Sequence, residues 1–340
     1  GKGYIPAEED PAKFHGIGKF DPATGKKLAV KVRTFSDNFG DTLVSIAQQN
    51  AKVCAITAAM PGGTGLLKFM YQFPDRLFDV GIAEEHAVSM AGGLAKQGMI
   101  PVVALYSTFL QRAFDQIMQD VAMLHLHVVF AIDRAGLVGD DGPTHHGVFD
   151  VGFLRQIPGL KILAPASLEE QTAMLYWAVR DYDGPVAIRY PRGAEGVYTE
   201  SAWDGTEKFA FCKEGTDALL ITYGTLVNTV LQAAERLELE GISCGVVRLM
   251  DLTDFAAPEI LVRMTHRRQV IVIEEAAANS GVKQSLAWNL RQLCPDCRIT
   301  GIDLGGEFVP HGDQKRLYEY CGLDADSIVH FVSGVLEHEE

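Results

Sequence analysis

Short apolar runs alternate with segments of helical periodicity along most of the chain. Runs at residues 53–57, 77–82, 101–105 and 128–132 predict buried strands, and segments at 37–49, 87–97 and 109–123 predict helices. The alternation returns with strands at 218–223, 244–248 and 269–274 and helices at 225–239 and 280–293. This pattern is typical of parallel sheets covered by helices, so the sequence predicts an α/β protein built from two parallel-sheet sandwich domains.

Two stretches interrupt this pattern. Residues 1–33 scatter Lys, Pro and Gly without a sustained period, which predicts an extended lead-in or linker. The polar stretch at 192–206 marks the expected boundary between a domain at 34–198 and a second at 205–340. A length of 340 residues agrees with two domains.

Composition narrows the classes of function. A formal net charge of −14 disfavours nucleic acid or an anionic membrane as the main partner, although a few arginines can hold a small anion on an acidic protein. No run of about 18 uncharged apolar residues is present, so the sequence predicts no membrane span. Six Cys in 340 residues are too few for a disulfide scaffold, and we expect a reducing, cytoplasmic compartment. The lone Cys294-Pro-Asp-Cys297 lacks the second pair that a structural zinc site needs, and we interpret it as two thiols near a helix end.

Four polar segments follow predicted strands, where open α/β sheets form their sites. The first, at 79–87, carries Glu84 and Glu85 at a helix start, although the helix dipole alone favours acidic residues there. The second, at 105–115, places Tyr106, Phe109 and Arg112 around another helix start. Its aromatic pair can stack on a planar heterocycle or simply belong to the core.

The other two segments are richer in charge. The third, at 131–147, gathers Arg134, three aspartates and the adjacent His145 and His146 in a Gly-rich loop, and such a density of titratable groups indicates function. Adjacent histidines rarely converge on one ion, so we expect no metal site there. The fourth, at 187–193, delivers Arg189 and Arg192, which can clamp a phosphate or form an interdomain salt bridge.

Together these segments resemble the thiamine-diphosphate-dependent transketolase superfamily and, within it, the 1-deoxy-D-xylulose-5-phosphate synthase family. The resemblance covers essentially the whole chain and is most specific at 133–150, 106–120 and 81–87, while residues 3–15 resemble the linker after that family's first domain. That first domain holds the diphosphate and Mg²⁺ through a Gly-Asp-Gly motif, which does not occur here. The resemblance therefore implies a pyrimidine-binding domain and a transketolase C-terminal domain that are inactive without a first domain.

The activity that the resemblance implies is the condensation of pyruvate and D-glyceraldehyde 3-phosphate to 1-deoxy-D-xylulose 5-phosphate with loss of CO2. This reaction feeds isoprenoid and thiamine biosynthesis. The implied cofactor is thiamine diphosphate, with Mg²⁺ held mainly by the first domain of the same enzyme. The implied assembly is a homodimer.

The resemblance also assigns roles to single residues of this sequence. Glu84 is expected to hydrogen-bond N1′ of the aminopyrimidine, and the other expected cofactor contacts are Phe109, Arg112, Tyr4 and Met60. Substrate binding is expected from Tyr106, Arg134, Arg192, Asp141 and His145. The catalytic set is Glu84, His145 and Asp141, and His146 is expected to lie behind them.

Other interpretations stay open. The chain could be a separate β-type subunit of a 2-oxo acid dehydrogenase or of a split transketolase, or a non-catalytic α/β binding protein that keeps the fold. The Gly-rich stretch at 61–65 matches no Walker loop and is interpreted as a tight turn near the site. In the second domain, Glu274, Glu275 and His311 are interpreted as structural residues or as part of a dimer contact.

Overall fold

Residues 1–33 form a small unit of their own. The computed structural model describes residues 1–15, 17–28, 32–199, 203–255, 257–262 and 268–337, which divide into units at 1–33 and 34–340. In the first unit the rings of Tyr4, Phe14 and Phe20 pack with centroids 5.5 to 5.9 Å apart. Two short helices and a hairpin therefore stand where the sequence predicts an extended stretch: α1 (Ile5–Glu9), α2 (Pro11–Phe14), β1 (Phe20–Asp21) and β2 (Lys26–Lys27).

The first sheet of the second unit is parallel throughout, in the order β4-β3-β5-β6-β8-β7. Its central strands are buried along nearly their whole length, as parallel strands covered on both faces must be. The continuous apolar runs of the sequence follow from this burial. The strands are β3 (Val53–Thr57), β4 (Leu77–Asp79), β5 (Ile100–Tyr106), β6 (Val129–Asp133), β7 (Lys161–Leu163) and β8 (Val186–Arg189).

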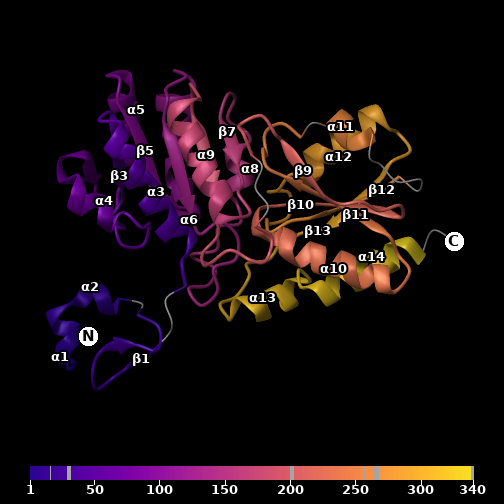
Figure 1. Cartoon of the computed structure of the whole chain (residues 1–340), viewed down its shortest axis with the longest axis horizontal. Helices are drawn as coiled ribbons and strands as arrows, with labels where there is room; N and C mark the ends of the chain where they lie inside the picture. The colour runs from indigo at the N-terminus through magenta and orange to yellow at the C-terminus, as the bar shows by residue number, and fades with distance from the viewer. Residues whose placement is uncertain (16, 29–31, 200–202, 256, 263–267, 338–340) are drawn as a thin grey trace. The chain divides into compact units, whose positions relative to one another are not determined.

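Helices cover both faces of this sheet (Figure 1). Ala55 of β3 packs in the core beneath α3 and α9, whereas its neighbour Ile56 packs in the core beneath α5, because successive strand side chains point to opposite faces. The helices and helical turns are α3 (Phe35–Gln49), α4 (Leu67–Gln72), η1 (Pro74–Arg76), α5 (Glu84–Lys96), α6 (Ser107–Leu110), η2 (Gln111–Ala113), α7 (Phe114–Gln116), η3 (Ile117–Ala122), α8 (Asp150–Leu154) and α9 (Leu168–Arg180).

The segment predicted as one amphipathic helix at 109–123 is broken. A 3₁₀ turn, η2, and a π-helical stretch, η3, interrupt it. Here the segment packs tightly against α5: a Cβ added to Gly92 would lie 2.7 Å from the carbonyl oxygen of Asp120, and Ser89 Oγ donates to Asp120 Oδ2 at 2.5 Å. Hydrophobic periodicity does not show breaks of this kind, because the apolar face is kept.

The second sheet has the order β13-β12-β10-β11-β9, with β9 antiparallel and the others parallel. Helices α10 and α14 pack on one face and α12 on the other. No helix in the described ranges is both long and apolar enough to cross a lipid bilayer. The elements are β9 (Phe209–Lys213), β10 (Ala218–Tyr223), η4 (Gly224–Leu226), α10 (Val227–Leu239), β11 (Cys244–Leu249), α11 (Ala257–Val262), β12 (Gln269–Ile273), α12 (Lys283–Leu293), β13 (Arg298–Ile302), α13 (Gln314–Cys321) and α14 (Ala325–Glu337).

A buried ion pair joins the two sheet domains. Arg248 of β11 donates from Nη1 and Nη2 to the carboxylate of Glu170 on α9, at 2.9 and 2.8 Å, and both side chains are fully buried. At the edge of the contact Lys161 Nζ lies 2.6 Å from Asp251 Oδ2. Since a buried charge must be paired, these contacts fix how the two domains pack.

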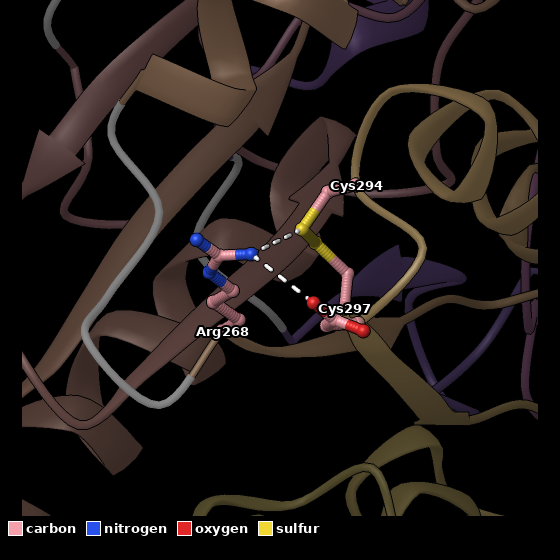
Figure 2. The surroundings of a disulfide bond; sticks show 4 residues. Arg268, Cys294 and Cys297 are labelled. Atoms are coloured by element: carbon pink, nitrogen blue, oxygen red, sulfur yellow. Dashed lines mark hydrogen bonds and ion pairs between the residues drawn. A yellow bond between two sulfur atoms is a disulfide. The ribbon is translucent and has the colours of Figure 1, made fainter.

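Cys294 and Cys297 form a disulfide in this structure, so their interpretation as two separate thiols is wrong. Cys294 caps the end of α12 and Cys297 directly precedes β13, which brings the two residues together across a tight turn. Figure 2 shows Arg268 beside the bond, with Nη1 3.5 Å from Cys294 Sγ. Both cysteines are buried.

Candidate active site

The polar segments singled out in the sequence lie beyond the carboxyl ends of adjacent parallel strands. Asp79 ends β4, Tyr106 ends β5 and Asp133 ends β6, and these strands are neighbours of β3 or of one another in the sheet. Open α/β sheets place their sites at this edge, because the loops that leave it can converge. The fold therefore brings three of the four segments to one edge, and β8 delivers the fourth there.

Glu84 is a buried carboxylate at the start of a helix. It is the first residue of α5, its side chain is 3% exposed, and Arg112 Nη1 donates to its Oε1 at 2.7 Å. The helix N-terminus and the guanidinium both stabilise a negative charge at this position. The adjacent Glu85 is exposed, so only one of the two neighbouring carboxylates is built into the site.

A row of aromatic rings extends from this carboxylate. Arg112 lies 5.1 Å from the centroid of the Phe109 ring, which stacks on Tyr106 at 5.8 Å and meets His145 edge-on at 5.3 Å. Phe109, Tyr106 and His145 are each partly exposed. These rings offer a flat apolar surface beside a buried carboxylate, which suits a planar heterocycle with a polar edge.

Arg134 closes the other end of the row. Its guanidinium lies 4.2 Å from the centroid of the Tyr106 ring and donates to the carbonyl oxygen of Gly63 at 2.7 Å and to Ser36 Oγ at 3.1 Å. It also pairs with the buried Asp133 at 2.8 Å. The φ of +59° at Arg134 is left-handed, a strained conformation for a residue with a side chain, and such strain concentrates at functional sites.

The electrostatics of this cluster follow from burial. Burial raises the pKa of Tyr106, while the charges of Arg134 and Arg192 act in the opposite direction. Burial likewise raises the pKa of Asp133, against the lowering effect of Arg134 and of the hydrogen bond that Ser36 Oγ donates at 2.6 Å. The charges of Arg134 and Arg192 both lower the pKa of Tyr106, so both guanidinium groups lie near its hydroxyl.

Arg192 and Asp141 form a more exposed pair. Arg192 Nη1 lies 2.9 Å from Asp141 Oδ2 and also donates to the carbonyl oxygen of Val138 at 2.9 Å, and nearly half of each charged side chain is exposed. Arg189, from the same strand end, is instead buried and pairs with Asp150 at 2.8 Å. The two arginines thus differ in role: Arg189 forms a buried structural ion pair within the domain, whereas Arg192 is accessible.

His145 and His146 also differ. Nδ1 of His145 lies 2.9 Å from Thr144 Oγ1, and its ring is partly exposed. His146 is buried; its Nδ1 accepts from the Val138 N–H at 3.1 Å, so its Nε2, 3.1 Å from the Pro310 carbonyl oxygen, carries the proton. Burial lowers the pKa of His146. Its place behind the accessible residues agrees with the sequence-based expectation.

Two further cofactor contacts were predicted, Tyr4 and Met60. Tyr4 belongs to the unit at 1–33, where its hydroxyl donates to the Pro22 carbonyl oxygen at 2.8 Å, and its contact with a cofactor stays a prediction. Met60 is half-buried against the core that contains Ile56, directly after Ala59, whose φ is +60°.

Ser36 and Gly63 complete the site; Gly63 lies in the Gly-rich stretch at 61–65, whereas no sequence motif marks Ser36. A Cβ added to Gly63 would lie 2.1 Å from the hydroxyl oxygen of Tyr106, so any larger residue here would displace the Tyr106 ring. The stretch at 61–65 is therefore a turn against the site, as interpreted. Ser36 lies 98 positions from Arg134, and only the sheet topology brings the two together.

Comparison with known proteins identifies both sheet domains. Residues 31–196 match the family "Transketolase, pyrimidine binding domain", and residues 207–328 match "Transketolase, C-terminal domain". The 1-deoxy-D-xylulose-5-phosphate synthase 1 of Geobacter sulfurreducens is 44% identical over 340 residues, which cover 96% of this chain and 52% of that protein. The synthase of Gloeobacter violaceus is 44% identical over 353 residues, which cover 100% of this chain and 54% of that protein.

Two solved structures share the fold. A "split gene transketolase, inactive beta4 tetramer" matches with a TM-score of 0.77 at 27% identity, over 90% of this chain and 99% of that one. The transketolase of Campylobacter jejuni matches with a TM-score of 0.75 at 20% identity, over 88% of this chain and 46% of that one. The chain spans about half the length of the curated relatives it matches. It belongs to the transketolase family, through the pyrimidine-binding and C-terminal domains of that family, and it resembles the corresponding half of the 1-deoxy-D-xylulose-5-phosphate synthases.

Proposed function

We propose that this chain supplies the pyrimidine-binding half of a thiamine-diphosphate-dependent synthase that condenses pyruvate with D-glyceraldehyde 3-phosphate and releases CO2, giving 1-deoxy-D-xylulose 5-phosphate. The observation that carries the proposal is the buried carboxylate of Glu84, paired with the half-exposed Arg112 at the head of the aromatic row. The identity of 42–44% to synthases over nearly the whole chain supports it.

The side chains of this site fit the aminopyrimidine end of the cofactor. An aminopyrimidine needs a flat apolar surface and a carboxylate at its ring nitrogen, and Phe109 and Glu84 supply them. Among the residues that the structure describes, no three His, Cys, Asp or Glu side chains gather as a metal site. The other end of the cofactor is its diphosphate with Mg²⁺. We propose that a first domain, from elsewhere in the enzyme, holds that end.

When bound, thiamine diphosphate supplies the carbon nucleophile that protein side chains lack. Glu84 would hydrogen-bond the ring nitrogen of a bound aminopyrimidine and exchange a proton with it, and Arg112 keeps the Glu84 carboxylate oriented through Oε1. Phe109 and Tyr106 would exclude water from one face of the bound ring.

The acceptor phosphate is held by Tyr106, Arg134 and Arg192. Arg134 stays paired with the buried Asp133 and presents an oriented charge. Arg192 exchanges its half-exposed pairing with Asp141 for the phosphate, and exposed pairs of this kind are worth only about 0–1 kcal/mol. Release of Asp141 frees that carboxylate for a substrate hydroxyl, and His145 donates a proton to the carbonyl oxygen of the acceptor as that oxygen becomes a hydroxyl.

The test is an assay of 1-deoxy-D-xylulose 5-phosphate formation by the full chain, with and without a first-domain chain from a related synthase. Thiamine diphosphate, Mg²⁺, pyruvate and D-glyceraldehyde 3-phosphate are supplied in both cases. We expect turnover only in the combined sample. Glu84→Gln should reduce the rate by roughly 10²-fold or more, because the proton-holding oxygen is lost.

Glu85→Gln is the matched control, since Glu85 neighbours Glu84 but is exposed. This variant should keep the rate of the parent chain. Turnover by the chain alone, or full activity of Glu84→Gln in the combined sample, would contradict the proposal.

A separate β-type transketolase subunit is the second candidate. The observation in its favour is that the split-gene transketolase chain is covered over 99% of its length. A combined sample that transfers two-carbon units from a ketose phosphate, and does not decarboxylate pyruvate, would decide for it. The homodimer, the cytoplasmic location, the link to isoprenoid and thiamine biosynthesis and the linker role of residues 1–33 belong to the first proposal.

A further inference from the structure

The loop at 134–147, which carries Arg134, Asp141 and His145, is held by the C-terminal domain. The N–H of Leu137 donates to Glu275 Oε1 at 2.7 Å, and Gln314 Nε2 donates to the Leu137 carbonyl oxygen at 3.0 Å. Glu275 follows β12 and Gln314 begins α13. Side chains from two elements of the other domain therefore bind both backbone polar groups of one loop residue.

Further contacts extend this attachment along the loop. The Gly139 carbonyl oxygen accepts from the Gly312 N–H at 3.4 Å, and the His146 ring bonds to the Pro310 carbonyl oxygen at 3.1 Å. Leu137, Gly139 and His146 of the loop are thus bonded to the segment just before α13 and to its first residue.

Glu275 approaches the loop so closely that a side chain at position 136 would collide with it. Gly136 has a φ of +82°, and a Cβ added to it would lie 2.7 Å from Cδ of Glu275. Glu275 is itself buried, with 8% of its surface exposed. A buried carboxylate needs hydrogen-bond donors, and the Leu137 N–H is one of them.

The attachment leads directly to the residues proposed to bind phosphate. Val138 follows Leu137, and its carbonyl oxygen accepts from Arg192 Nη1 at 2.9 Å. The same nitrogen contacts Asp141. A shift of the Leu137 backbone therefore moves an acceptor of Arg192.

We propose that Glu275 and Gln314 are positioning residues for the acceptor phosphate: they fix Leu137, and through Val138 they set the place of Arg192. This inference rests on the proposed function. It gives the C-terminal domain a part in the reaction although none of its residues belongs to the predicted site.

The test uses Gln314→Leu in the full chain, because Gln314 is exposed and its replacement leaves the core intact. Gln284→Leu is the matched control: Gln284 is an exposed residue of α12 whose amide bonds only to Asn279 in the described structure. Amide hydrogen exchange of the 134–147 loop is measured first, since it needs no activity. We expect exchange in the loop to be about tenfold faster in Gln314→Leu and unchanged in Gln284→Leu.

Kinetics of the combined sample come second. We expect the KM for D-glyceraldehyde 3-phosphate to rise about tenfold in Gln314→Leu while the KM for pyruvate stays within about twofold. Glu275→Leu should behave in the same way, and Glu275→Gln should restore both readouts because its amide oxygen still accepts from Leu137.

Unchanged loop exchange in Gln314→Leu overturns the inference, and so does faster exchange with both KM values unaffected. A parent sample without synthase turnover overturns the proposed function instead, and with it the role toward phosphate. The exchange experiment then still decides whether the C-terminal domain holds the loop.

Discussion

Replacing Arg248 by Met should lower the free energy of unfolding by about 3–5 kcal/mol. The side chains of Arg248 and Glu170 are both 0% exposed, and two hydrogen bonds of 2.8 and 2.9 Å join them. Met fills most of the volume of the arginine stem but removes the charge. The carboxylate of Glu170 then stays buried and keeps the hydrogen bond that the Ala166 N–H donates at 2.7 Å. The loss of unfolding free energy in Arg248→Met therefore comes mainly from leaving the Glu170 carboxylate buried without its cation, and less from the lost contact itself.

The reasoning predicts a specific pattern in a double-mutant cycle. In a Glu170→Gln background the amide oxygen still accepts from Ala166, and no unpaired charge remains when Arg248 is replaced. The same Arg248→Met change should then cost at least about 2 kcal/mol less, since replacing a whole buried pair is often close to neutral. Urea unfolding of the four proteins at one pH measures this coupling through the shift of the midpoint at constant slope.

Lys213→Met is the matched control. Lys213 pairs with Glu238 at 2.6 Å, but the glutamate side chain is 60% exposed. Its loss should cost less than about 1 kcal/mol. A loss below about 1 kcal/mol for Arg248→Met, or an equal loss in both backgrounds, would refute the account of the domain contact as a buried charge pair.

Three further changes test other parts of the structure. Burial is the main cause that raises the pKa of Glu275 to about 7, so between about pH 4.5 and 7 the native protein keeps a proton that the unfolded chain releases. The stability contributed by this proton is complete below about pH 4.5 and is lost as the pH rises through about 7. Urea unfolding from pH 5 to 8 should therefore show the parent falling relative to Glu275→Gln by about 2.5 kcal/mol. Gly63→Ala should raise the KM for D-glyceraldehyde 3-phosphate in the combined sample, since its Cβ meets the Tyr106 hydroxyl, whereas Gly62→Ala, whose nearest neighbour is 3.8 Å away, should not. Replacing both cysteines of the disulfide by serine should lower the free energy of unfolding by about 2 kcal/mol, the loop-closure value for so short a ring; an unchanged urea midpoint would contradict this.

The strands were the part of the fold that the sequence predicted best. The runs at 53–57 and 218–223 coincide with β3 and β10, because a strand covered on both faces must be apolar throughout. The place of the site followed from the same pattern, since polar residues after such strands meet at one edge of the sheet.

Contacts that depend on packing could not be predicted in this way. The breaks at η2 and η3 follow from the fit against α5, which leaves the hydrophobic period unchanged. Arg134 donates to Ser36 Oγ and to the Gly63 carbonyl oxygen, and both acceptors come from segments far away in the sequence. The sequence around Glu275 indicates only a structural residue or a dimer contact. Its hydrogen bond with Leu137 joins two domains, and a contact over such a sequence separation leaves no local pattern.

The β9 edge of the second sheet bears on how copies of the chain meet. β9 runs antiparallel, and its register with β11 shifts between Val246 and Val247. A bulged, twisted edge that carries a lysine is a poor template for backbone pairing with a further strand. Lys213 ends this strand and holds its charge toward Glu238. The bulge and the lysine therefore disfavour the addition of a strand from another copy at this edge. Flat edges without such features allow strand addition to continue from copy to copy, which leads to aggregation.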